Sequence, residues 1–169
     1  MKPMIIAETD RLILRRLTHE DKHFILRLVN EPSWLRFIGD RNVHSPEDAV
    51  RYITDGPMAM YAKYGFGLFL VALKGSDTPI GMCGLLKRDT LEHADIGFAF
   101  LPEYWGQGYA YEAAAATMAY GQKQHGLNKI IAITSPDNAS SIKLLKKLGL
   151  VEKEIIQLPG YSGETLVME

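Results

Sequence analysis

Residues 94–125 read ADIGFAFLPEYWGQGYAYEAAAATMAYGQKQH, and this stretch decides the fold. It opens with a short apolar run, 95–101, which is typical of a buried strand and stops at Pro102. A turn with two glycines follows, and an alanine-rich segment then predicts a helix from about Gly108 to Gly126. The free N–H groups and the positive dipole end at the start of a helix favour anions. The stretch therefore predicts a binding site for an anionic, phosphorylated ligand.

The composition indicates one globular domain, residues 1–169, with enough hydrophobic residues (47%) to build a core. A formal net charge of −1 gives no long-range attraction to nucleic acid or to an acidic membrane, so we expect neither as a partner. Cys83 is the only cysteine, which excludes a disulfide framework and a Cys-rich metal site. The sequence shows no signal-peptide pattern and no apolar run of ~18 residues, so we expect a cytoplasmic protein.

Helical and strand patterns alternate along the rest of the chain. Thr18 and Ser45 both look like N-caps, and Gly56-Pro57 should interrupt the second of these helices. The predicted strands are 9–17, 67–74, 79–87, 95–101, 129–134, 151–158 and 163–168. The predicted helices are 18–29, 33–40, 45–64, 108–126 and 139–148. This mixture predicts a single α/β or α+β domain.

Several blocks of the sequence resemble the GNAT superfamily of acetyl-CoA-dependent N-acetyltransferases, and most of all its ribosomal-protein-N-acetyltransferase-like branch. The blocks are ADIGFAFLPEYWGQGYAYEA (94–113), NKIIAI (128–133) and NASSIKLLKKLGL (138–150), with weaker matches in TDRLILRRLTHED (9–21) and PIGMCGL (79–85). The resemblance implies a mixed, mostly antiparallel sheet of about seven strands, flanked by helices. It also implies that the sheet splays after Leu101 to form a cofactor slot.

The resemblance further implies how the co-substrate acetyl-CoA is held, without a metal. Backbone groups of Phe100 and Leu101 would hold the pantetheine arm, together with the side chain of Asn138 and, one helical turn on, Ser141. The backbone amides that would hold the pyrophosphate are those of Gly106, Gln107, Gly108, Tyr109, Ala110 and Tyr111.

The implied reaction is attack of a primary amine on the thioester, which needs a group or a water to accept the proton of the amine. Asp95 is the first candidate base, although a strand-end aspartate paired with a surface cation is at least as strong an interpretation and proximity alone could suffice. Leu145 stands where many superfamily members carry a tyrosine that protonates the CoA thiolate, so Ser141 is the candidate for that step. The weaker candidate bases are Glu103, Asp40 and His93.

The acceptor implied by the resemblance is a protein N-terminal amine, with a small amine such as a polyamine or a metabolite as the alternative. A non-catalytic module that binds acetyl-CoA is an alternative of another class. We expect the stretch 31–64 and the loop 159–163 to shape the acceptor site, and the protein to be a monomer or homodimer.

Two further motifs point to different chemistry. Residues 19–23, HEDKH, fit the HExxH zinc pattern, but a helix begins at the motif and no third ligand follows. Residues 106–111, GQGYAY, resemble a dinucleotide fingerprint, but Tyr111 is too large for the sixth position. We expect neither a zinc protease nor an NAD-dependent enzyme.

Overall fold

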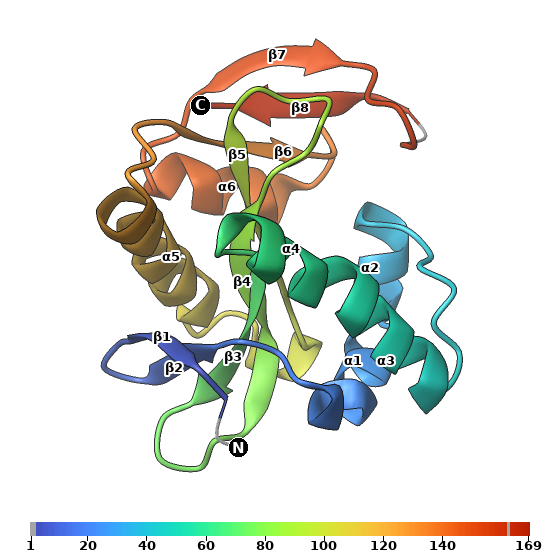
Figure 1. The fold of residues 1–169 in the computed structure, drawn as a ribbon. Helices are drawn as coiled ribbons and strands as arrows, with labels where there is room; N and C mark the ends of the chain where they lie inside the picture. The colour runs from blue at the N-terminus through green and yellow to red at the C-terminus, as the bar shows by residue number, and fades with distance from the viewer. Residues whose placement is uncertain (1–2, 162) are drawn as a thin grey trace.

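A computed structural model describes residues 3–161 and 163–169 and contains one sheet of eight strands (Figure 1). Neighbouring strands run antiparallel except β5 and β6, which are parallel. In sheet order the strands are β1 (Ile5–Glu8), β2 (Leu12–Arg15), β3 (Leu68–Leu73), β4 (Pro79–Leu86), β5 (Ala94–Phe100), β6 (Ile130–Thr134), β8 (Thr165–Met168) and β7 (Glu152–Ile156). The predicted mixed, mostly antiparallel sheet is confirmed.

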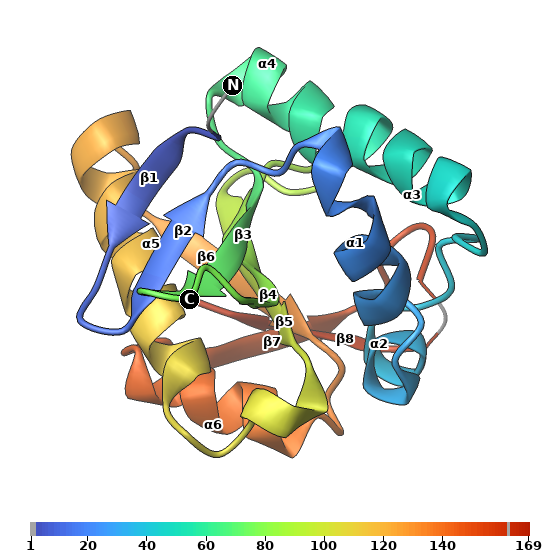
Figure 2. The same cartoon turned by 90° about the horizontal axis from the view of Figure 1, so that it is seen from below.

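Helices cover both faces of this sheet (Figures 1 and 2). The helices and helical turns are η1 (His19–Asp21), α1 (Lys22–Leu28), α2 (Pro32–Phe37), α3 (Pro46–Ile53), η2 (Thr54–Met58), α4 (Ala59–Tyr64), η3 (Pro102–Tyr104), α5 (Tyr109–His125) and α6 (Ala139–Lys147). Helices α1, α2 and α3 lie on one face, and α5 and α6 lie on the other. Among the described residues, no helix combines the length and apolar character that crossing a membrane requires.

The two predicted helix starts are confirmed by their caps. Thr18 and Asp21 form a reciprocal capping box at the start of η1. Ser45 accepts a hydrogen bond from the Asp48 backbone N–H at 3.1 Å, and Pro46 occupies the first turn of α3. Local sequence therefore fixes where these segments turn into helices.

The structure refines one predicted element and adds another. The predicted interruption at Gly56-Pro57 is the π-helical turn η2, which separates α3 from α4. A wider turn accommodates the proline ring, which would otherwise meet the carbonyl four residues back. The extra strand β1 was not predicted, since this edge strand is largely exposed and shows no strong apolar pattern.

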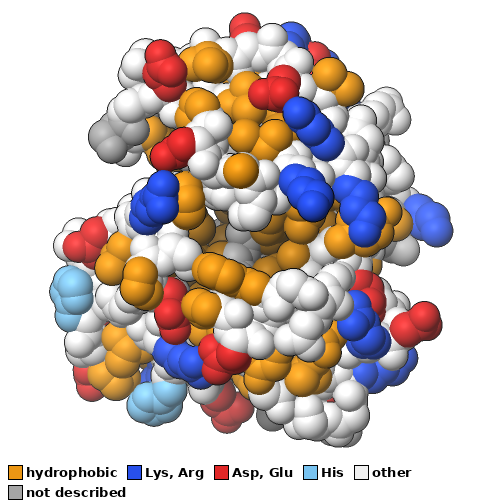
Figure 3. All heavy atoms as spheres, turned by 180° about the vertical axis from the view of Figure 1, so that it is seen from behind, with side chains coloured by type: hydrophobic (Ala, Val, Ile, Leu, Met, Phe, Trp, Pro, Cys, Tyr) orange, Lys and Arg blue, Asp and Glu red, His pale blue; other side chains and the backbone are white. Residues whose placement is uncertain are grey.

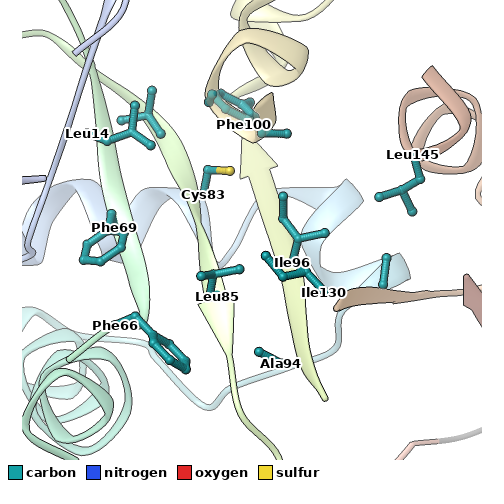
Figure 4. Close-up of a cluster of buried hydrophobic side chains, with 14 of the residues drawn as sticks. Leu14, Phe66, Phe69, Cys83, Leu85, Ala94, Ile96, Phe100, Ile130 and Leu145 are labelled. Atoms are coloured by element: carbon teal, nitrogen blue, oxygen red, sulfur yellow. The ribbon is translucent and has the colours of Figure 1, made fainter. Parts of the chain in front are cut away.

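Alternation along β5 divides its side chains between two cores. Ala94, Ile96 and Phe100 pack on the face covered by α5 and α6, where Leu145 of α6 points toward β5 (Figure 4). Leu101, just beyond the strand, packs on the opposite face with α1 and α3. Because both faces are buried, β5 reads as a continuous apolar run in the sequence.

Candidate active site

The sheet opens between β5 and β6. The two strands pair only at Ala94–Ile130 and Asp95–Ile131. Beyond these pairs β5 stays with β4, whereas β6 pairs with β8, and Figure 4 shows the two strands diverging. Seen from behind, the surface is hollowed near its middle and hydrophobic side chains border the hollow (Figure 3). The splay therefore begins after Asp95, earlier than the expected point after Leu101, and it leaves an open strand edge along the rest of β5.

The open edge exposes the backbone groups of alternate residues. The Leu101 N–H bonds to the Ile80 carbonyl at 2.9 Å, so Phe100 and Phe98 must direct their own N–H and C=O groups away from β4. The Phe100 carbonyl accepts a hydrogen bond from the Trp105 indole at 2.9 Å. Of the two residues predicted to hold pantetheine, Phe100 faces the opening and Leu101 does not. The backbone of Phe98, which was not among the predicted residues, also faces the opening, as counting the alternation back from Phe100 shows.

The glycine turn (residues 105–108) leads from η3 into α5. Gly106 and Gly108 have left-handed backbones, with φ of 75° and 83°, which a residue with a Cβ adopts only with strain. The first helical bond of α5 runs from the Glu112 N–H to the Gly108 carbonyl at 3.1 Å. The N–H groups of residues 108–111 therefore have no partner within the helix, and the turn is exposed. These open donors suit a phosphate group.

The start of α6 borders the slot on its other side. The Asn138 side chain caps this helix, with Oδ1 accepting from the Ser141 N–H at 3.4 Å and from the Ser140 hydroxyl at 3.2 Å. Ser141 is half-buried, and Leu145, one turn further, is fully in the core. On the last turn of α6 the Lys147 ammonium lies 4.2 Å from the centre of the Tyr111 ring, which places a cation beside the first turn of α5.

Asp95 lies at the closed end of the slot, 1% exposed, on the sheet face opposite α5. Its carboxylate accepts a hydrogen bond from Arg88 Nε at 3.1 Å, and Arg88 Nη1 donates to the Tyr161 hydroxyl at 2.6 Å. Burial raises the pKa of Asp95, although the adjacent Arg88 guanidinium opposes this rise. Asp95 is therefore ion-paired, as the structural alternative expects, and Arg88 links it to Tyr161 in the predicted acceptor loop 159–163. Residue 162 of that loop lies outside the described residues.

The other residues singled out in the sequence are engaged elsewhere. Glu103 is held by two hydrogen bonds from Arg27, which lower the pKa of its carboxyl and make it a poor base. Asp40 accepts from a neighbouring backbone N–H, and His93 lies 3.9 Å from an exposed glutamate. His19 of the HExxH segment has its Nε2 within hydrogen-bond distance of the Thr54 hydroxyl, at 2.8 Å. Within residues 3–161 and 163–169, no group of three or more His, Cys, Asp or Glu side chains could hold a metal ion.

A small apolar cavity of about 90 Å³ lies on the same sheet face as Asp95. Leu86, which lines it, stands opposite Asp95 across β4 and β5. A Cβ atom on Gly97 would lie 3.3 Å from Leu86 Cδ1 and 3.6 Å from Leu68 Cδ2, so the cavity adjoins β5. The lining residues are Tyr52, Gly56, Pro57, Met60, Leu68 and Leu86, and none is charged.

Comparisons with known proteins identify the family and the fold. A family model described as an acetyltransferase (GNAT) domain matches residues 11–151. The chain is 31% identical over 162 residues to the N-acetyltransferase YoaA of Bacillus subtilis (strain 168), covering 95% of this chain and 90% of YoaA. A solved GNAT-family acetyltransferase from Bacillus anthracis superposes with a TM-score of 0.78 at 26% identity, covering 95% of each chain. RimL, a ribosomal L7/L12 alpha-N-protein acetyltransferase solved with coenzyme A, shares the fold with a TM-score of 0.81 at 17% identity, covering 97% of this chain and 95% of RimL.

Proposed function

This chain belongs to the GNAT acetyltransferase family, and from that premise we propose that it acetylates the N-terminal amine of proteins or peptides whose first side chain is apolar. That it is an acetyl-CoA-dependent N-acetyltransferase follows from the family. The apolar cavity beside Asp95 and β5 is the observation that carries the choice of acceptor.

The proposed acetyl-CoA site uses the slot and the glycine turn. The open N–H groups of residues 106–111 would hold the pyrophosphate, and Lys147 would add positive charge beside it. The backbone of Phe98 and Phe100 would bond to the pantetheine amides as an added strand. Asn138 uses its Oδ1 to cap α6, so its Nδ2 group is the donor we assign to the pantetheine.

The cavity favours an apolar acceptor over a polyamine. A polyamine carries several positive charges, and burying a charge without a partner is costly. The six lining residues of the cavity supply no carboxylate, and the nearby Arg88 would repel a second cation. An N-terminal residue with an apolar side chain could place that side chain over Leu68 and Leu86 and its amine toward β5.

The reaction forms an amide bond and breaks the thioester. The amine must lose a proton before or during its attack, and we assign that proton to Asp95, directly or through water. The thiolate that leaves must gain a proton, and we assign that donor to Ser141 or to a water beside it. Holding both reactants in one slot supplies the remainder of the rate enhancement.

Calorimetric titration with acetyl-CoA, followed by acetylation assays, tests the proposal. We expect one acetyl-CoA site per chain. We also expect turnover with peptides that begin with Leu, Met or Phe at least about tenfold above that with spermidine, a difference of ~1.4 kcal/mol. Binding without turnover on any amine would indicate a non-catalytic module, and a preference for spermidine would contradict the acceptor assignment.

Met60→Glu should reverse the acceptor preference, because it places a carboxylate at the half-buried rim of the cavity. We expect kcat/KM for an apolar peptide to fall about tenfold, and that for spermidine to rise, since a buried cation gains a partner. Ala59→Glu is the matched control, because Ala59 is the preceding residue of the same helical segment and is exposed. Equal effects of both variants would show that general surface charge, and not the cavity, sets the preference.

A further inference from the structure

Arg11, in the turn between β1 and β2, holds the glycine turn from outside the slot. Its Nη1 donates to the Gln107 carbonyl at 3.0 Å, and its Nε donates to the Glu112 carboxylate at 2.8 Å. The Arg11 backbone N–H donates to the other Glu112 oxygen at 3.1 Å, and the Thr9 hydroxyl donates to that same oxygen. The guanidinium also lies 4.3 Å from the centre of the Tyr109 ring. Arg11 therefore contacts Gln107 in the glycine turn and both Tyr109 and Glu112 in the first turn of α5.

The bond to Gln107 orients the next peptide group. In a trans peptide the C=O and the following N–H point in opposite directions. With the Gln107 carbonyl turned toward Arg11, the Gly108 N–H points to the other side of the turn. The Gly108 carbonyl is also occupied, by the Glu112 N–H. Both carbonyls thus accept hydrogen bonds from the protein, and the N–H groups remain available for an anion.

Glu112 is an acidic residue in the first turn of α5, where the helix dipole favours a carboxylate but a nearby phosphate does not. By charge alone a carboxylate in the first turn of α5 would repel a bound pyrophosphate. Partial burial raises the pKa of Glu112, but hydrogen bonds from Thr9 and Arg11 outweigh this effect and leave the pKa below its ordinary value. The Arg11 side chain is 44% exposed, and an ion pair with a solvent-exposed partner stabilises a fold by only ~0–1 kcal/mol. This carboxylate is better explained as a support for Arg11 than as a source of stability.

We propose that Arg11 is a positioning residue for the phosphates of acetyl-CoA, acting through the Gln107 carbonyl and supported by Glu112 and Thr9. The inference rests on the proposed role of the glycine turn as the phosphate site. Its consequence is that the opening segment of the sequence, which is 96 positions from Gln107 along the chain, contributes to cofactor affinity.

Arg11→Met should raise the KM for acetyl-CoA about tenfold with little change in kcat. The KM for S-acetylpantetheine, which has no phosphates, should stay unchanged. Glu112→Gln should also weaken acetyl-CoA binding, although it removes a negative charge beside an anionic ligand. Lys129→Met is the matched control, because Lys129 pairs with Glu169 at 2.9 Å and its side chain is 43% exposed, against 44% for Arg11. Lys129 directly precedes β6, whose first residue pairs with the start of β5, whereas the glycine turn follows the end of β5.

Three results would overturn the inference. An unchanged KM in Arg11→Met would exclude any role in cofactor binding. An equal rise in KM for S-acetylpantetheine would show general damage to the slot. Tighter acetyl-CoA binding by Glu112→Gln would show that Arg11 acts by direct charge and that Glu112 competes for it. Failure of the unaltered protein to bind acetyl-CoA would instead remove the proposed function itself.

Discussion

Gly108→Val is expected to lower the affinity for acetyl-CoA at least about a hundredfold, or ~2.7 kcal/mol. Gly108 has φ of 83°, and a β-branched residue is strongly disfavoured there. A Cβ atom would also lie 3.2 Å from Arg11 Nη2, so the side chain that supports the turn would have to move. Isothermal titration of acetyl-CoA measures the loss, and thermal unfolding should remain cooperative because Gly108 is exposed.

Gly126→Val separates backbone strain from loss of the binding site. Gly126 ends the same helix with φ of 60°, and no atom lies within 4 Å of the position its Cβ would take. This control should lose some stability and keep its acetyl-CoA affinity. Equal affinity in Gly108→Val and in the unaltered protein would contradict the assignment of the glycine turn to the phosphates.

Much of the fold could be predicted because local chemistry determines it. The caps at Thr18 and Ser45 are formed by side chains within three residues of the helix start, so a short window of sequence contains both partners. A short window also placed the interruption at Gly56-Pro57, but it did not show that a π-helical turn carries the chain through it. The edge strand β1 could not be predicted from hydrophobic periodicity, because a strand that is largely exposed needs no apolar pattern.

The candidate site was only partly predictable for a different reason. The two glycines of the turn indicate in the sequence that the backbone has positive φ there. The residues that support this turn are distant along the chain, however. Arg11 and Glu112 are 101 positions apart, and nothing in either segment indicates the other. The pairing of Arg88 with Asp95 can be seen only in the folded chain. The register of β4 and β5 is likewise needed to see that Phe98, and not Leu101, faces the opening.

Asp95→Asn is expected to lower kcat about 10²–10³-fold, within the range for loss of a general base. A base must be deprotonated to act, so activity of the unaltered protein should rise with pH through the pKa of Asp95. Burial raises that pKa, which places the rise above the ordinary range of an aspartate. The variant should lose this rise and stay slow at every pH. The measurement is kcat against pH with a peptide acceptor at saturating acetyl-CoA.

Arg88→Met distinguishes a catalytic Asp95 from a structural one. The Arg88 guanidinium favours the charged carboxylate, so removing it should raise the pKa of Asp95 further and move the rise in activity to higher pH. At sufficiently high pH this variant should recover activity that Asp95→Asn never recovers, because its base is still present. If Asp95 serves only as the ion-pair partner of Arg88, both variants should lose stability alike and keep the pH profile of the unaltered protein. That outcome would leave proximity of amine and thioester as the main source of catalysis.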